Sequence, residues 1–75
     1  TLSEFQRAVL DEFGDAQGRA LVRDLVMRQL GHQTPQQALD AGQAPAVVWR
    51  ALCEEMDVPQ PRRYGVGIAV PPEAR

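Results

Sequence analysis

Five helix-breaking residues divide most of this chain into short segments, and that division limits what the chain can fold into. The breakers are Gly14, Gly31, Gly42, Pro59 and Pro61. Glycine tolerates the left-handed conformation that closes a helix, and proline cannot continue one. Between the breakers, apolar residues recur three and four positions apart, which is the helical period. The sequence therefore predicts an all-α fold, a small orthogonal helical bundle of about four helices with an extended C-terminal tail.

The first two helices are expected over about residues 4–13 and 16–30. Ser3, with Gln6 three positions later, has the pattern of a capping box at the start of the first helix. Asp15 is the expected N-cap of the second helix. The residues expected to face the core from these two helices are Phe5, Val9, Leu10, Phe13, Leu21, Val22, Leu25, Val26 and Leu30.

The third and fourth helices are each marked by a proline in the first turn. Thr34, Pro35 and Gln37 give the third helix an N-cap, a proline at its first position and a capping-box partner. The fourth helix is expected to begin at Pro45 and to end before Pro59. The residues expected to face the core from these helices are Ala38, Leu39, Val48, Trp49, Leu52, Cys53 and Met56.

Two residues on the apolar faces predict how the helices pack. Gly18 lies inside the apolar arc of the second helix. Because glycine inside a helix costs about 1 kcal/mol relative to alanine, we expect Gly18 to allow a neighbouring helix to approach closely. Trp49 is expected at the centre of the core, because the chain has few other aromatic residues. The alternative for Trp49 is an interface position, since tryptophan is enriched in binding hot spots.

The chain is expected to consist of a helical domain over residues 1–59 and a tail over residues 60–75 that contains prolines and glycines. Apolar side chains alternate along the tail in a weakly strand-like pattern. These alternating residues are Tyr64, Val66, Ile68 and Val70. We expect the tail to pack back over the helices, because a small domain lacks covering surface. The alternatives are a disordered linker or a strand that adds to the sheet edge of a partner.

Composition argues against several classes of function. The chain has a net charge of −2 from eight arginines, no lysine and ten acidic residues, which disfavours a general binder of nucleic acids or membrane surfaces. One cysteine, Cys53, and one histidine, His32, cannot form an internal disulfide or a zinc site. We therefore expect no enzyme activity and no cofactor or metal. With a lone cysteine, no signal peptide and no membrane-spanning run, a cytoplasmic location is expected.

Short motifs from Leu2 to Arg63 resemble domain of unknown function family 3046, a family of small single-domain actinobacterial proteins. The motifs are SEF at 3–5, FG at 13–14, RD at 23–24, LG at 30–31, QALDAG at 37–42, VWRALC at 48–53 and DVP at 57–59. The resemblance implies a compact helical domain without an established activity. The chain departs from the family pattern at Leu25, where histidine is usual, and at Gln33, where arginine is usual. A role that depends on either of those family residues therefore does not carry over.

A non-catalytic interaction module, acting as a protein-binding adaptor or regulator, is the function that these observations favour. The partner would be another protein, and a homodimer is a further option. Arg19 and Arg23 stand beside Ala16, Ala20 and Met27 on the second helix, a mixture that suits an acidic or aromatic partner surface. The alternative is a partly buried arginine that pairs with an Asp or Glu of its own fold. The full set of candidate partner-binding residues is Arg19, Arg23, Arg50, Arg62, Arg63 and Tyr64.

The third and fourth helices also have the residue spacing of a helix-turn-helix, which makes a DNA-associated domain the alternative function. Ala38, Gly42 and Val48 fall where this motif needs a small inward residue, a turn glycine and a buried apolar residue. The face of the fourth helix that would meet DNA carries one arginine, Arg50, and several carboxylates, which phosphates would repel. That face is expected to comprise Val47, Arg50, Ala51, Glu54, Glu55 and Asp57.

Overall fold

Four α-helices make up most of the structure, a computed structural model that describes residues 2–63 and 66. The helices are α1 (Leu2–Phe13), α2 (Asp15–Asp24), α3 (Pro35–Asp40) and α4 (Pro45–Glu55), with two 3₁₀ turns, η1 (Arg28–Leu30) and η2 (Gln60–Arg62). In place of strands, the described residues hold a single isolated bridge between Met27 and Gln33. The predicted all-α bundle is confirmed. None of these helices has the length and apolar character needed to cross a membrane.

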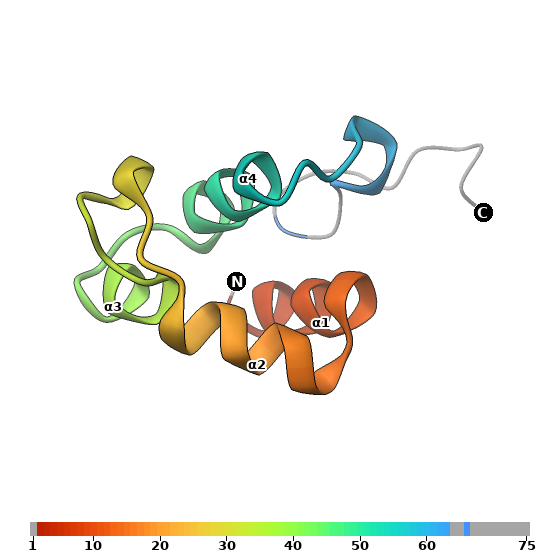
Figure 1. Cartoon of the computed structure of the whole chain (residues 1–75), viewed down its shortest axis with the longest axis horizontal. Coiled ribbons are helices and arrows are strands. Elements are labelled where there is room, and N and C mark those ends of the chain that lie inside the picture. Colours follow the sequence, from red (N-terminus) through yellow and green to blue (C-terminus); the bar gives the residue numbers. More distant parts are fainter. Residues whose placement is uncertain (1, 64–65, 67–75) are drawn as a thin grey trace.

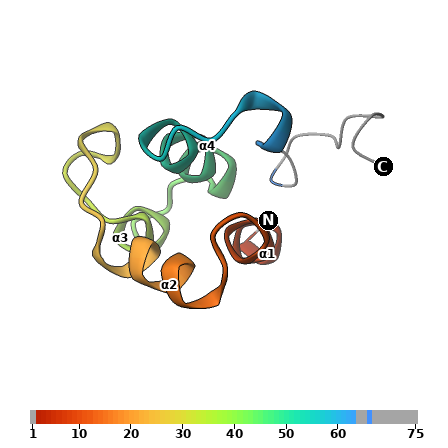
Figure 2. The same cartoon turned by 45° about the vertical axis from the view of Figure 1, so that its right-hand side comes forward.

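The helices form a closed circuit around the core. Each of α1, α2 and α3 packs against the next helix, and α4 returns to contact α1. Figures 1 and 2 show α4 on one side of the core and α2 on the other, next to α1 and α3. This arrangement leaves the outer side of α2 without a covering element among the described residues.

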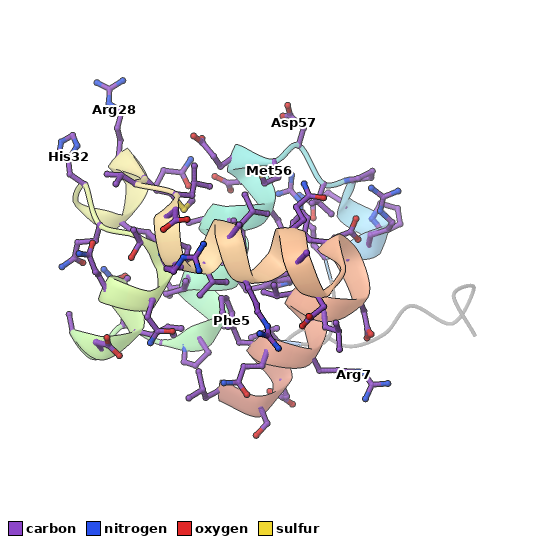
Figure 3. The ribbon with its side chains drawn as sticks, turned by 60° about the horizontal axis from the view of Figure 1, so that its bottom comes forward. Phe5, Arg7, Arg28, His32, Met56 and Asp57 are labelled. Carbon is purple, nitrogen blue, oxygen red and sulfur yellow. The ribbon has the colours of Figure 1, made fainter. Side chains whose placement is uncertain are left out.

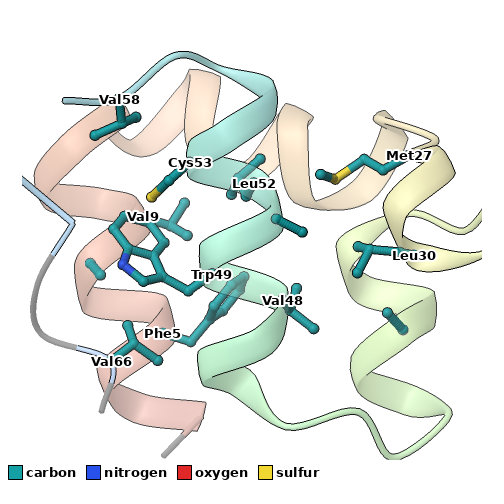
Figure 4. Packing of buried hydrophobic residues seen from close by; sticks show 13 residues of the cluster. Phe5, Val9, Met27, Leu30, Val48, Trp49, Leu52, Cys53, Val58 and Val66 are labelled. Carbon is teal, nitrogen blue, oxygen red and sulfur yellow. The ribbon is translucent and has the colours of Figure 1, made fainter. Parts of the chain in front are cut away.

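Trp49 lies at the centre of the core (Figure 4). Its ring is 1% exposed and meets Phe5 and Phe13 edge to face, with centroids 6.4 Å away in both cases. Edge-to-face pairs stabilise a core by about 0.5–1.5 kcal/mol beyond the area that they bury. The prediction that Trp49 fills the core is therefore confirmed. The buried residues of α4 are Val48, Trp49, Ala51, Leu52 and Cys53.

A single residue, Gly14, links α1 to α2. Its N–H donates to the carbonyl of Leu10 at 2.9 Å, and its own carbonyl accepts from the N–H of Gly18 at 3.0 Å. Gly14 has φ 80° and ψ 173°, a conformation that glycine adopts far more readily than other residues. Gly14 is thus the N-cap of α2, and the prediction that Asp15 is the cap is wrong. Ser3, predicted as a cap, lies inside the first turn of α1.

Close packing of α1 on α2 depends on Gly18, as predicted. A β-carbon on Gly18 would stand 2.7 Å from Cγ1 of Val9, closer than side chains tolerate. Gly18 is also the one buried residue of α2. α2 is therefore held by this close contact with α1, by its packing on α3 and by half-buried side chains.

The second helix ends at Asp24, and the prediction that it continues to Leu30 is wrong. Leu25 has an extended conformation, and Met27 bonds to Gln33 across the turn that includes η1. The Met27 carbonyl accepts from the N–H groups of both Leu30 and His32. This hairpin-like turn brings Met27 and Leu30 into the core, each 1% exposed, where a straight helix would carry Leu30 beyond it.

The capping box of α3 is confirmed. The Thr34 hydroxyl accepts from the N–H of Gln37 at 3.1 Å, and the Gln37 side chain accepts from the N–H of Thr34 at 2.9 Å. Pro35 occupies the first helical position and lacks the N–H that would otherwise need a partner there. These contacts define where a helix of only six residues begins.

Beyond α4, the chain runs back over α1. Arg62 forms an ion pair with Glu12 of α1 at 3.2 Å, and Arg63 donates from Nε to the carbonyl of Val58. Val66 is fully buried in the core cluster. The rest of the predicted strand-like pattern, with Tyr64, lies outside the described residues.

Candidate functional site

A groove with a volume of about 600 Å³ runs along the outer side of α1, α2 and α3. α1 and α2 form its two long walls, and Gln36 and Leu39 of α3 border it as well. The residues that line it on α1 are Leu2, Phe5, Gln6, Val9 and Leu10. Those from the start of α2 onward are Gly14, Asp15, Gly18, Arg19, Val22 and Arg23. Both sets are spaced three and four residues apart, so each wall is one continuous stripe along a helix.

The α1 wall of the groove ends in two exposed leucines. Leu2 is 50% exposed and Leu10 is 47% exposed, although Leu10 was predicted to face the core. The apolar arc of α1 is wider than the core can cover, because Phe5, Ala8 and Val9 already occupy the buried side. Leu10 is therefore left on the surface of the groove. Val26, also predicted in the core, is 58% exposed because the extended segment after α2 turns it outward.

The α2 wall carries the charge of the groove. Nε of Arg19 donates to Asp15 at 3.0 Å, an ion pair between residues four positions apart on α2. Arg23 bonds both oxygens of Asp24, and these bonds hold the pKa of Asp24 below its ordinary value. Both arginines nonetheless remain exposed, so the predicted pairing occurs without burial. Exposed pairs of this kind contribute at most about 1 kcal/mol and exchange partners readily.

The predicted mixed face of the second helix is only partly present. Arg19 and Arg23 share the groove wall, and Ala16 and Ala20 are exposed on the same helix. Met27 is buried in the core instead, because α2 ends before it. The apolar side chains beside the two arginines therefore come from α1 and α3, and Met27 is not among them.

The other candidate partner-binding residues lie away from this groove. Arg50 is exposed on α4. Arg62 and Arg63 follow α4 and are engaged with Glu12 and with the carbonyl of Val58, as described above. Tyr64 lies outside the described residues. The structure thus brings together two of the six candidates, Arg19 and Arg23, in one site.

A second hollow of about 460 Å³ lies on the opposite side of α1, beside Trp49. Nε1 of Trp49 is buried and has no hydrogen-bond partner among the described residues. Charged side chains around this hollow pair with each other, Arg7 with Asp11 and Arg62 with Glu12. The apolar residues that line this hollow, Ala8 and Trp49, are buried, so it offers less exposed apolar surface to a partner than the groove with Leu2 and Leu10.

Cys53 and His32 do not form a catalytic pair. Cys53 is fully buried, and burial raises the pKa of its thiol to about 11, which suppresses the reactive thiolate. His32 is exposed in the turn after η1, where Figure 3 shows it pointing outward together with Arg28. Its φ of 63° is unusual for a residue other than glycine. The described residues also contain no cluster of His, Cys, Asp and Glu that could hold a metal ion.

The positions of the predicted helix-turn-helix have the expected burial, but α4 differs from the prediction at one point. Ala38 and Val48 are fully buried, and Gly42 has a φ of 96°. Ala51, predicted to face outward, is buried because α4 packs on both α1 and α3. The exposed residues of α4 and its C-terminal turn are Val47, Arg50, Glu54, Glu55 and Asp57.

Sequence reasoning missed the α1 and α3 walls of the groove. Leu2 and Gln36 were given no binding role, Gln6 was assigned to a capping box, and Leu10 and Leu39 were assigned to the core. The signal that could have found the α1 wall is its apolar arc. The side chains of that arc spread over more of the helix circumference than a single packing face needs.

The residues that line the groove all lie within the part of the chain that a protein-family model matches. The family model described as Protein of unknown function (DUF3046) matches residues 1–61, which include all four helices. No curated protein and no solved structure matches the chain. The predicted resemblance is confirmed, and because the match covers most of its 75 residues, the chain belongs to the DUF3046 family.

Proposed function

We propose that this chain is a non-catalytic protein-binding module, an adaptor or regulator whose binding face is the groove between α1, α2 and α3. One observation carries the proposal. Apolar side chains that a monomer would normally bury, above all Leu2 and Leu10, are exposed in a hollow that Arg19 and Arg23 border. Apolar surface rimmed by polar groups is typical of protein interaction sites, and arginine is enriched in them.

The packing of α2 supports the same proposal. α2 buries only Gly18, so much of its surface has no tertiary partner among the described residues. A helix of ten residues gains little stability from its own hydrogen bonds, and most helical stability in proteins comes from packing. A partner in the groove would add to the contacts that α2 makes with α1 and α3. The free thiol of Cys53 fits a reducing compartment, so we place this function in the cytoplasm.

Site-specific cross-linking in cells of the native host tests the proposal. A photoreactive side chain replaces Leu10 in the groove or, as a control, Glu55 on α4. We expect a discrete protein adduct from Leu10 that disappears when Arg19→Glu and Arg23→Glu are added, and no such adduct from Glu55. No adduct from Leu10, or the same adduct from both positions, would overturn the proposal.

A DNA-associated helix-turn-helix domain is the second candidate function. The observation that favours it is the burial of Ala38 and Val48 around the turn at Gly42. Against it, Arg50 is the one exposed cation of α4, beside Glu54 and Glu55. With this charge, duplex DNA should bind no more tightly than about 10⁻⁴ M at physiological salt. Micromolar binding that falls steeply with salt and is lost in Arg50→Ala would favour this candidate instead.

A further inference from the structure

We infer that the segment after α4 is a strap that opens and closes over Trp49 while the four helices stay folded. Among the described residues, the strap comprises Pro59, η2 (Gln60–Arg62), Arg63 and Val66. This inference goes beyond the proposed function and does not depend on the groove. It follows from the small number of contacts that hold the strap and from the side chain beneath it.

The strap buries very little of itself. η2 has no buried residue, and its three residues are exposed, as is Pro59 before it. Each of the four α-helices, in contrast, buries at least one residue and packs against two other helices. Segments with few buried contacts open at a lower free energy than the whole domain unfolds. η2 therefore has the features of a segment that opens on its own.

Three contacts between described residues hold the strap closed. Arg62 pairs with Glu12 of α1 at 3.2 Å, but its side chain is 59% exposed, so water and salt weaken the pair. Arg63 donates to the carbonyl of Val58, a bond that reaches back only five residues and does not join the strap to α1. The third contact is the Val66 side chain, which is fully buried in the core cluster. Burial of Val66 is therefore the main attachment of the strap to the helices.

The side chain beneath the strap favours its opening. Trp49 is 1% exposed, and its Nε1 has no hydrogen-bond partner among the described residues. Figure 4 shows the indole nitrogen on the edge of the ring that faces away from α4, on the side where Val66 lies. A buried N–H without an acceptor lowers stability, and opening lets water supply the acceptor. The closed strap is therefore less stable than its buried area alone would make it.

Val58 marks the point after which the chain can move. Its side chain is 2% exposed, and its N–H donates to the carbonyl of Cys53 at 2.9 Å, so Val58 stays with α4. Opening after Val58 exposes Trp49 and the hollow of about 460 Å³ that Trp49 and Arg62 line. Tryptophan is enriched in binding hot spots. The strap is thus an autoinhibitory cover, because Trp49 is accessible to a partner in the open state alone.

Hydrogen exchange in the full chain, followed by NMR, tests this inference. Nε1–H of Trp49 reports opening of the strap, and the backbone N–H of Leu52 inside α4 reports unfolding of the helices. We expect the protection factor of the Trp49 Nε1–H to be at least about tenfold lower than that of the Leu52 amide. Low concentrations of urea should accelerate exchange at Leu52 more steeply than at Trp49, because opening of the strap exposes less surface than unfolding of the helices.

Matched variants separate the strap from the helices. Val66→Ala weakens the main attachment and should accelerate exchange at Trp49 by up to about thirtyfold. Arg62→Gln removes the ion pair and should accelerate exchange at Trp49 by no more than about fivefold. Thr34→Ala removes the cap of α3, a helix that packs on α2 and α4. Thr34→Ala should therefore accelerate exchange at Leu52 by about fivefold and leave exchange at Trp49 unchanged.

Three outcomes would overturn the inference. The first is equal protection and equal urea dependence at Trp49 and Leu52, which would mean that the strap and the helices unfold together. The second is acceleration by Thr34→Ala that is as large at Trp49 as at Leu52. The third is exchange of the Trp49 Nε1–H at the unprotected rate, which would mean that the strap does not close over the ring. The urea dependence of the unsubstituted chain decides the question even if Val66→Ala does not fold.

Discussion

At the scale of the residue, Gly18 and Val9 control the distance between α1 and α2. Val9 is buried and β-branched, so its side chain has one strongly preferred rotamer in a helix and cannot swing aside. A β-carbon at position 18 would meet it at 2.7 Å. Any side chain at Gly18 must therefore push the two helices apart.

Gly18→Ala should lower the free energy of unfolding by up to about 2 kcal/mol. Overpacking lowers stability by about 1–3 kcal/mol. The higher helix propensity of alanine raises stability by at most about 1 kcal/mol in compensation. Urea denaturation measures the change. Gln17→Ala, at the exposed neighbouring position, is the control and should change stability by less than about 0.5 kcal/mol. A gain in stability for Gly18→Ala would show that the helices do not pack as closely as described.

Cys53 should make the stability of the protein fall at alkaline pH. Burial raises the pKa of its thiol from 9.0 to about 11. The pKa of the thiol is therefore higher in the folded protein than in the unfolded chain. The contribution of the neutral thiol to stability is complete below about pH 9 and is lost as the pH rises towards 11, by up to about 3 kcal/mol. Urea denaturation at several pH values measures this loss, and Cys53→Ala should show a shallower dependence over the same range. Rapid alkylation of the native thiol at pH 8 would contradict the burial of Cys53.

Residue-scale features were predictable from the sequence where local chemistry decides them. Thr34 and Gln37 lie three positions apart, so their mutual capping follows from the sequence alone. Burial of Trp49 followed from its size and from the scarcity of other aromatic residues. The wide apolar arc of α1 indicates that part of it stays uncovered, but not that the uncovered residue is Leu10, because only the final arrangement of helices decides that. Asp15 was misassigned because Gly14 can cap α2 with its backbone alone.

At the scale of the element, the starts of α3 and α4 and the end of α1 were predictable, and the end of α2 was not. The prolines at the first positions of α3 and α4 stand where the sequence placed them. The end of α2 was not predictable, because the apolar period continues past Asp24 while the chain does not remain helical. A backbone hydrogen bond between Met27 and Gln33, outside any helix, determines where α2 ends. The same competition between the local apolar period and distant contacts explains why Met27 lies in the core and not on the predicted binding face.

The capping box should be important for α3, because this helix has only six residues. Thr34→Ala removes the oxygen that accepts from Gln37 and should cost about 1 kcal/mol of unfolding free energy. Thr34→Ser keeps that oxygen and is the matched control, so it should cost clearly less. Urea denaturation of both variants, with amide exchange at residues 37–41, measures the effect. Equal losses in the two variants would mean that the Thr34 methyl group, and not the cap, stabilises this turn.

At the scale of the whole molecule, the core is completed by a residue beyond the family match. The match ends at residue 61, and Val66 is buried in the core cluster with side chains from α1 and α4. Figure 4 shows Val66 on the same side of the cluster as Phe5 and Trp49. The ion pair between Arg62 and Glu12 holds the preceding turn against α1. Val66 therefore extends the hydrophobic core past residue 59, after which the tail was predicted to begin.

Val66→Ala should destabilise the whole domain although it lies outside the matched region. The substitution removes two buried side-chain carbons. It should lower the free energy of unfolding by about 2 kcal/mol, including the cost of the cavity that remains. In a domain of this size, such a loss lowers the melting temperature by roughly 10 °C. Val47→Ala makes the same change at a residue that is 46% exposed, and it should leave melting nearly unchanged. Thermal unfolding followed by Trp49 fluorescence compares the two variants. Equal melting temperatures for both would mean that Val66 does not belong to the core and that the four helices are stable without it.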